Sequence, residues 1–261
     1  MKKGLVILLL SVLITGSTAA QSDHISFRNI SINEGLSQSS VVDIAADHTG
    51  FVWFATQDGL NRYDGKKFLI FKKSFDDFTT ASTSTTGKLA IGSHNDLWMI
   101  TRGGKLEKMN LYDQTILPIP MLNGVQLPPV SCVYPDGDHI WIGTESRGLF
   151  IYNLKTKQLI HHVAGSPSTS HISSNHIQEI FGDKLGRKWI LTAKGLSVFE
   201  HIYASAQTFL NYSVFNSKSG ISCSSVAEDF NNNLWLGTYG QGLLVKKKND
   251  SLFRPFNGYN K

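Results

Sequence analysis

The sequence predicts an all-β fold, a β-propeller of four-stranded antiparallel blades with five repeats present. Three observations predict it. The tryptophans stand 45, 43, 48 and 46 residues apart, a threonine follows each by three positions, and short β-forming runs surround them without a helical period. Repeats of this length are typical of propeller blades, because one blade alone cannot bury its own faces. The tryptophans are Trp53, Trp98, Trp141, Trp189 and Trp235.

Each repeat is expected to contain four strands. The first is a Val/Ile run, as in residues 41–44 and 177–181, the second carries the tryptophan, the third follows Gly-Leu, and the fourth is apolar and aromatic. An aspartate stands six residues before the tryptophan in repeats one, four and five, inside a polar turn. The second repeat departs from the pattern, since it has Gly103-Gly104-Lys105-Leu106 and lacks a clear first strand.

The five tryptophans are predicted to be structural, each filling the seam between neighbouring sheets. A buried aromatic side chain removes about 150 to 250 Å² from water, which makes it the main packing group of such a seam. The glycines of the first repeat are predicted to serve turns. Gly59 supplies a left-handed conformation and Asp64-Gly65 closes a hairpin, and no helix follows that could hold a phosphate.

The first 20 residues have the pattern of a secretory signal peptide. Lys2 and Lys3 precede an apolar run over residues 5–14, and small residues follow up to Ala20. The apolar run is about half of the roughly 20 residues that a membrane helix needs, and no second apolar span follows. We therefore expect a signal peptide over 1–20, propeller blades over 21–261, a periplasmic location and no membrane span in this chain.

The charge of the chain argues against a nucleic-acid partner. Without the two leader lysines, 23 Lys and Arg residues face 20 Asp and Glu residues, and the basic residues are scattered. Cys132 and Cys223 belong to different repeats, so we expect two buried thiols rather than a disulfide. The sequence predicts no cofactor and no metal site, because no familiar ligand spacing occurs.

The repeat count predicts an incomplete ring. Residues 25–31, "ISFRNIS", stand where an outer fourth strand would be, without the first three strands of its blade. The fifth repeat has its own fourth strand in "SLFRPF". We therefore expect the front part of a seven-bladed ring that is truncated in this chain. A closed ring of five blades, with residues 25–31 pairing loosely outside it, is the alternative.

The stretch "GLSQSSVVDIAADHTGFVWFATQDGLNRYDGKKF", residues 35–68, and its weaker copies resemble the two-component regulator propeller repeat. The resemblance covers the chain after the leader. It implies the periplasmic sensor region of hybrid two-component system histidine kinases of Bacteroides-type bacteria, which commonly sense glycan fragments. It also implies further blades, often a second propeller, and a kinase core. The kinase motifs have no counterpart in this sequence, so the chain itself is not expected to be an enzyme.

A ligand is expected on the face where the loops between second and third strands emerge, and the resemblance implies that it is an oligosaccharide. Loops that lead into first strands share this face and add Ser39, His171, His176 and Ser224. Arg, Tyr, Gln and Asp side chains suit hydroxyl-rich or acidic sugars. The predicted ligand-binding residues are Gln57, Asp58, Arg102, Glu145, Arg147, Lys194, Tyr239 and Gln241.

Two other functions fit the same face. A stand-alone secreted propeller with lyase or hydrolase activity would use His171, His176 and Glu145 as acid and base groups. A protein-docking scaffold would present the face to another polypeptide. The parts expected to partner the chain in a receptor are the remaining blades or a second propeller.

Overall fold

The computed structural model describes residues 26–71, 86–165, 171–200, 208–212 and 222–258. The predicted signal peptide over 1–20 lies outside these residues. The chain divides into two units, Met1–Ile30 and Ser31–Lys261, and the second unit carries every described strand. None of the described residues forms a helix long and apolar enough to cross a membrane.

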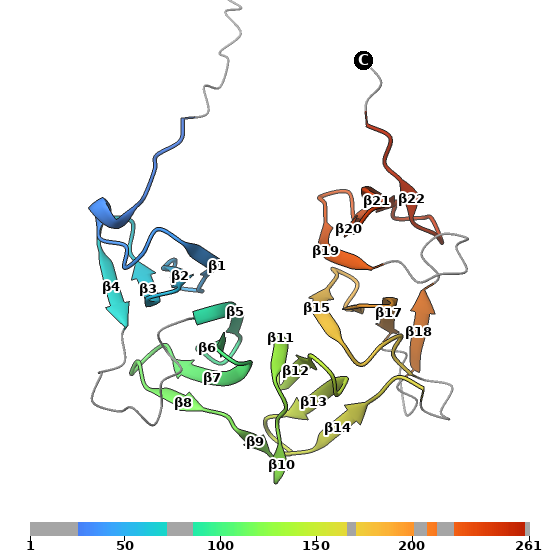
Figure 1. Cartoon of the computed structure of the whole chain (residues 1–261), viewed down its shortest axis with the longest axis horizontal. Coiled ribbons are helices and arrows are strands. Elements are labelled where there is room, and N and C mark those ends of the chain that lie inside the picture. Colours follow the sequence, from blue (N-terminus) through green and yellow to red (C-terminus); the bar gives the residue numbers. More distant parts are fainter. Residues whose placement is uncertain (1–25, 72–85, 166–170, 201–207, 213–221, 259–261) are drawn as a thin grey trace, which may run out of the picture. The chain divides into compact units, whose positions relative to one another are not determined.

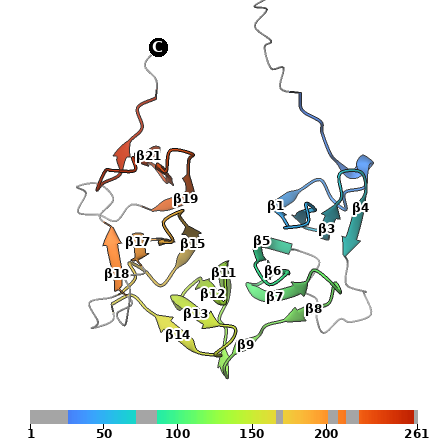
Figure 2. The ribbon, with the colours of Figure 1, turned by 180° about the vertical axis from the view of Figure 1, so that it is seen from behind.

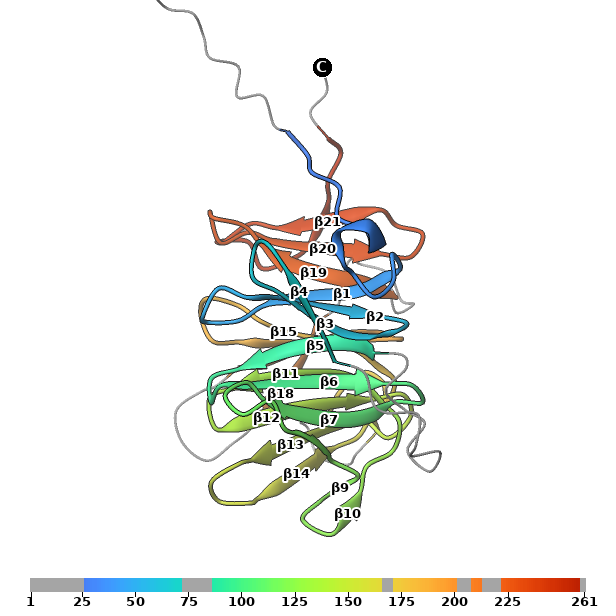
Figure 3. The ribbon, with the colours of Figure 1, turned by 90° about the vertical axis from the view of Figure 1, so that its left-hand side faces the viewer.

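Five four-stranded antiparallel sheets confirm the predicted propeller blades, and each tryptophan lies on the second strand of its sheet (Figure 1). Blade 1 contains β1 (Val41–Ala46), β2 (Val52–Thr56), β3 (Gly59–Tyr63) and β4 (Phe68–Phe71). Blade 2 contains β5 (Thr86–Gly92), β6 (Asp96–Thr101), β7 (Lys105–Asn110) and β8 (Ile116–Pro118). Figure 3 shows β5, β6 and β7 of blade 2 side by side.

The other three blades repeat this order. Blade 3 contains β11 (Val130–Asp136), β12 (His139–Thr144), β13 (Leu149–Asn153) and β14 (Leu159–His162). Blade 4 contains β15 (Ile177–Gly182), β16 (Lys188–Thr192), β17 (Gly195–Glu200) and β18 (Thr208–Tyr212). Blade 5 contains β19 (Cys223–Glu228), β20 (Leu234–Thr238), β21 (Leu243–Lys246) and β22 (Arg254–Pro255).

Three local predictions need correction. No strand forms over residues 26–31; instead a 3-10 helix, η1 (Ile32–Glu34), follows, because the Ser31 and Glu34 side chains complete a capping box. The second blade does have a first strand, β5, although its sequence lacks the Val/Ile pattern. A small hairpin of β9 (Met121–Leu122) and β10 (Val125–Gln126) was not predicted, although Asn123-Gly124 with positive φ at both residues is the sequence that such a turn favours.

The core lies between the blades. The first strands of successive blades, β1, β5, β11, β15 and β19, lie next to one another (Figure 2). In three of the four seams the tryptophan-bearing face of one blade packs on the two apolar residues beside the tryptophan of the next blade, and in the seam between blades 3 and 4 it packs on Ile190 alone. Trp53, for example, shares a core with Leu97 and Met99, and Trp189 shares one with Leu234 and Leu236. The first four tryptophans are buried, as predicted, whereas Trp235 is half-buried.

The aspartate of each polar turn fixes the tryptophan that follows it. The carboxylates of Asp47, Asp183 and Asp229 accept hydrogen bonds from the indole N–H of Trp53, Trp189 and Trp235, at 2.7, 2.9 and 2.9 Å. Each carboxylate also accepts backbone N–H groups of its own turn. The spacing of six residues therefore has a role in the seam as well as in the turn.

Blades 2 and 3 lack this aspartate bond. The indole nitrogens of Trp98 and Trp141 are buried without a hydrogen-bond partner in the described part of the structure. Asp136 instead forms an ion pair at 3.0 Å with the buried ammonium group of Lys188, which belongs to blade 4. In blade 3 the aspartate near the tryptophan, Asp136, therefore joins two blades and does not bind the indole.

Because hydrogen bonds lower the pKa of Asp229 in its turn, we expect the free energy of unfolding to decrease in acid. The indole N–H of Trp235 and the amide groups of Asn233 hold the pKa of Asp229 at about 2, below the roughly 3.9 of an unfolded chain. A group with a lowered folded pKa stabilises the fold above its unfolded pKa, and that contribution disappears as the pH falls through its folded pKa. We expect urea unfolding of the wild type to lose stability between about pH 4 and pH 2.

The matched variant is Asp229→Asn, which cannot titrate at this position. Its free energy of unfolding should start lower at neutral pH, since the indole bond is weakened, and should fall less between pH 4 and pH 2. Equal acid losses in variant and wild type would contradict this assignment.

Side chains at or beside β-bulges form hydrogen bonds between the innermost strands of neighbouring blades. The register of all five first strands shifts near the start of the strand. The hydroxyl of Ser131 at one bulge donates to the carbonyl of Ile177 on the next blade, at 2.6 Å. Asp43, beside another bulge, accepts the backbone N–H of Leu89 on the next blade at 2.8 Å. Bulges therefore give unpaired edge groups of the inner strands a partner.

Cys132 and Cys223 are buried free thiols, as predicted. Burial raises the pKa of Cys132 to about 12 and that of Cys223 to about 11. Since the thiolate is the reactive form, both groups are inert packing residues at neutral pH.

Candidate functional site

The loops between second and third strands are held by the repeated threonines. The hydroxyl groups of Thr56, Thr144 and Thr192 donate to the carbonyls of Gly59, Gly148 and Gly195, at 2.9, 2.7 and 2.9 Å. The same hydroxyl accepts a backbone N–H from the loop. The donors are Asp58, Arg147 and Lys194, three of the predicted ligand-binding residues. In blade 5, Thr238 likewise donates to the Gly242 carbonyl and accepts the N–H of Gln241, a fourth predicted residue.

The loops that enter the first strands meet these threonine-held loops on one face, as predicted. The backbone N–H of Glu145 donates to the carbonyl of Pro129 at 3.0 Å. Ala193 donates to His176 at 3.1 Å, and Tyr239 donates to Ser222 at 3.0 Å, in the same way. We call this side of the blades the loop face, meaning residues 57–58, 102–104, 145–148, 193–194 and 239–242 with the entering loops beside them.

The predicted ligand-binding residues are accessible on this face. Asp58 is half-buried, and the other seven are exposed, with Tyr239 at 67 %. They are spread over all five blades at one or two residues per blade, so they outline a surface rather than a compact constellation. Whether they bind a ligand stays a prediction.

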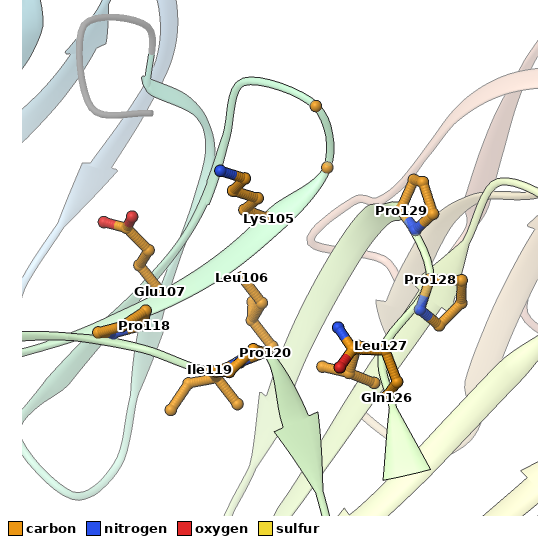
Figure 4. A pocket seen from close by; sticks show the side chains of 12 residues that line it. Lys105, Leu106, Glu107, Pro118, Ile119, Pro120, Gln126, Leu127, Pro128 and Pro129 are labelled. Atoms are coloured by element: carbon orange, nitrogen blue, oxygen red, sulfur yellow. The ribbon is translucent and has the colours of Figure 1, made fainter. Parts of the chain in front are cut away.

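A pocket of about 330 Å³ lies between the start of β7 with the loop before it and the chain entering blade 3. Figure 4 shows Pro118 and Pro120 on one side of it and Pro128 and Pro129 on the other. Leu106 is buried in its wall. The remaining lining residues are Gly103, Gly104, Lys105, Glu107, Ile119, Gln126 and Leu127.

Gly104, one of the lining residues, allows a close approach of two backbones. Its φ is +71°, and a Cβ atom there would lie 2.7 Å from the backbone nitrogen of Val130 and 2.8 Å from the Cα of Pro129. The Val130 N–H donates to the Gly104 carbonyl at 2.8 Å, so two backbones touch at this point. The second repeat therefore has Gly104 outside the Gly-Leu pattern at the point where the backbone of Pro129 and Val130 leaves no room for a side chain. The sequence analysis identified the unusual Gly103-Gly104 loop but did not predict the pocket. The proline-rich link with its Asn-Gly turn could have indicated it.

Two of the residues predicted for acid–base catalysis, Glu145 and His176, stand on loops that are joined by the hydrogen bond from the Gly148 N–H to the Asn175 carbonyl, at 2.9 Å. His176 and Glu145 lie on different blades, and their contacts with neighbouring loops are backbone hydrogen bonds. His161 stacks on Phe150 with ring centroids 4.0 Å apart and bonds the Arg147 carbonyl, which indicates a packing role. No group of three or more metal-binding side chains occurs among the described residues.

Comparisons with known proteins agree with this fold. No family model matches the sequence. Histidine kinase P4 of Formosa agariphila is 42 % identical over 66 residues, which are 25 % of this chain and 5 % of the kinase. The extracellular domain of the putative hybrid two component system BT4673 from B. thetaiotaomicron superposes with a TM-score of 0.70 at 21 % identity, over 88 % of this chain and 29 % of that one.

A third similar structure is an enzyme. Virginiamycin B lyase from Staphylococcus aureus superposes with a TM-score of 0.60 at 10 % identity, over 84 % of this chain and 70 % of the lyase. Identities at this level establish the fold alone. The chain spans less than a third of the sensor domain and a small part of the kinase. It resembles the extracellular domains of hybrid two-component systems in fold and, over 66 residues, a histidine kinase in sequence.

Proposed function

We propose that the chain is an extracytoplasmic, periplasmic ligand-sensing module, the N-terminal part of a hybrid two-component sensor kinase. The match to histidine kinase P4 carries this proposal, because it is a likeness in sequence and not in fold alone. The signal-peptide pattern of residues 1–20 supports export. Signalling would pass through parts of the receptor outside this chain, since the sequence lacks the kinase motifs.

The proposed ligand is a glycan-derived oligosaccharide bound on the loop face. Arg102 and Arg147 are exposed there and can donate paired hydrogen bonds to hydroxyl or carboxylate groups. Tyr239 offers a flat apolar surface with a polar end, which suits a sugar ring. These three side chains are exposed, so a ligand on the loop face can reach them.

Thermal-shift titration with neutral and acidic oligosaccharides tests this function. Maltohexaose, laminarihexaose and oligogalacturonate are suitable probes. A ligand at 100 times its Kd should stabilise the folded chain by about 2.7 kcal/mol. Arg102→Ala and Arg147→Ala should weaken the effect, while Lys66→Ala, at the β3–β4 turn on the other end of its sheet, should not. The proposal is wrong if no oligosaccharide shifts the unfolding of the wild type.

The lyase likeness supports a second candidate, a secreted propeller enzyme. This candidate predicts turnover of a substrate on the loop face, with loss of turnover in His176→Ala. Binding without turnover in the same titrations would favour the sensor.

A further inference from the structure

The segment that joins blades 2 and 3 is uncharged. No charged residue occurs between Asp113 and Asp136. The β9–β10 hairpin within it packs on the core of the seam through Leu122, which is 7 % exposed. Four prolines of this segment line the pocket described above, and each proline ring fixes its own backbone φ. The segment is therefore an uncharged and rigid part of the surface.

Backbone hydrogen bonds hold the walls of the pocket in place. The N–H of Ile119 donates to the carbonyl of Leu106 at 2.8 Å, and the N–H of Leu127 donates to the carbonyl of Pro120 at 2.9 Å. The backbone contact at Gly104 holds the loop of blade 2 against the chain entering blade 3. Since the pocket is already formed, binding would require little ordering of the chain, which favours affinity.

The chemistry of the pocket suits an apolar group better than a sugar. Figure 4 shows the ammonium group of Lys105 and the carboxylate of Glu107 pointing away from Pro128 and Pro129, whereas the amide of Gln126 points into the space between the walls. The proline rings bring no N–H donors to the walls. A sugar hydroxyl buried against them would lose its bonds to water without replacement, which is costly. The pocket is therefore fitted to an uncharged, apolar side chain.

The apolar surface continues beyond the pocket on both sides. Leu117 is 56 % exposed and Met121 is 53 % exposed. Side chains alternate along an extended chain, so Leu117 shares a face with Ile119, which lines the pocket. Met121 lies opposite Gln126 in the β9–β10 hairpin and shares its face. We call the pocket together with Leu117 and Met121 the apolar patch.

We propose that the apolar patch docks an uncharged polypeptide segment that inserts one tryptophan, phenylalanine or leucine side chain into the pocket. The pocket volume of about 330 Å³ is near the lower end for ligand sites, which suits a single anchoring side chain. A small apolar molecule would fill the pocket alone, whereas a polypeptide also covers Leu117 and Met121, as the surround of an anchor in protein interfaces does. The amide of Gln126 can bond the main chain of the segment. This inference goes beyond oligosaccharide sensing, because it assigns a ligand of another class to other residues.

Selection of random peptides displayed on phage, with the wild-type chain as the target, tests this docking. The enriched peptides should share a tryptophan, phenylalanine or leucine with uncharged neighbours, and a synthetic peptide of that consensus should bind in fluorescence polarisation. Gln126→Glu places a carboxylate against the pocket and should weaken binding at least ~10-fold, because an unpaired buried charge is costly. Met121→Ser should weaken binding about 5-fold, because apolar contact outside the pocket is lost.

Leu185→Ser is the matched control, since Leu185 is an apolar side chain, 68 % exposed, on the β15–β16 turn outside the patch. It should bind the peptide like the wild type. Circular dichroism checks folding, and Gln126→Lys replaces a Gln126→Glu variant that misfolds. The proposal is overturned by the lack of an enriched consensus, by a charged consensus, or by equal binding to the Gln126 variant. Unchanged binding by Met121→Ser also overturns it, since the pocket would then take a small apolar group alone. The oligosaccharide titrations rest on Arg102 and Arg147, so failure of sugar sensing would be recognised separately.

Discussion

Replacing Trp189 with Ala should cost about 3 to 5 kcal/mol of folding free energy. Trp189 is fully buried between blades 4 and 5, edge-on to Phe253 with ring centroids 6.0 Å apart. Its loss would leave a cavity and remove the indole donor from Asp183. The free energy of unfolding of a typical domain is only about 5 to 15 kcal/mol, so this substitution should remove a large part of it. Urea unfolding followed by circular dichroism measures the effect.

Trp235→Ala is the matched control. This residue has the same place in its blade and an equivalent aspartate partner, Asp229, but it is only half-buried, and among the described strands none packs on its outer side. We expect a smaller loss than at Trp189, because less apolar surface is removed from water. Equal losses at both positions would show that seam burial is not what makes the tryptophans matter.

Replacing Gly104 with Ala should be the second large effect, with a loss of about 3 kcal/mol or more from positive φ and overpacking together. The new methyl group would meet the backbones of Pro129 and Val130, which cannot move aside as a flexible side chain can. The link between blades 2 and 3 and the pocket should both be disturbed. The thermal unfolding midpoint should fall by about 2–4 °C for each kcal/mol lost.

Gly103→Ala separates the two causes. Gly103 also has a positive φ, +78°, but a Cβ atom there meets nothing within 4 Å. The Gly103→Ala variant should therefore lose only the roughly 1–2 kcal/mol that a positive φ costs a residue with a Cβ atom. If the two variants were equally stable, the close approach of the Pro129 backbone would be refuted.

The blade architecture could be predicted from the sequence because its determinants recur. A tryptophan, a threonine and a turn at fixed spacing repeat five times, and period-based reasoning needs no long-range information. The features that were missed occur once. The strand β5 lacks the usual Val/Ile run, and the β9–β10 hairpin interrupts a single link, so no second copy reveals either.

The candidate site was predictable only as a face. The sequence places Arg102 and Tyr239 on equivalent loops, since each follows a repeated threonine by one position. It does not indicate the pocket that Gly104 and Pro129 help to line, because this depends on the backbone of Pro129, which leads into the next blade. It also could not distinguish Asp136, which pairs with Lys188, from the aspartates that bind indoles.

The threonine bonds have an evolutionary consequence. Since the hydroxyl of Thr144 closes its turn by accepting an amide and donating to a carbonyl, the turn is held by Thr144 and the backbone and not by the exposed side chain of Arg147. Substitutions of exposed tip residues other than glycine should therefore change the surface of the loop face at little cost in stability. The surface of one blade can vary in this way while the scaffold beneath it stays the same.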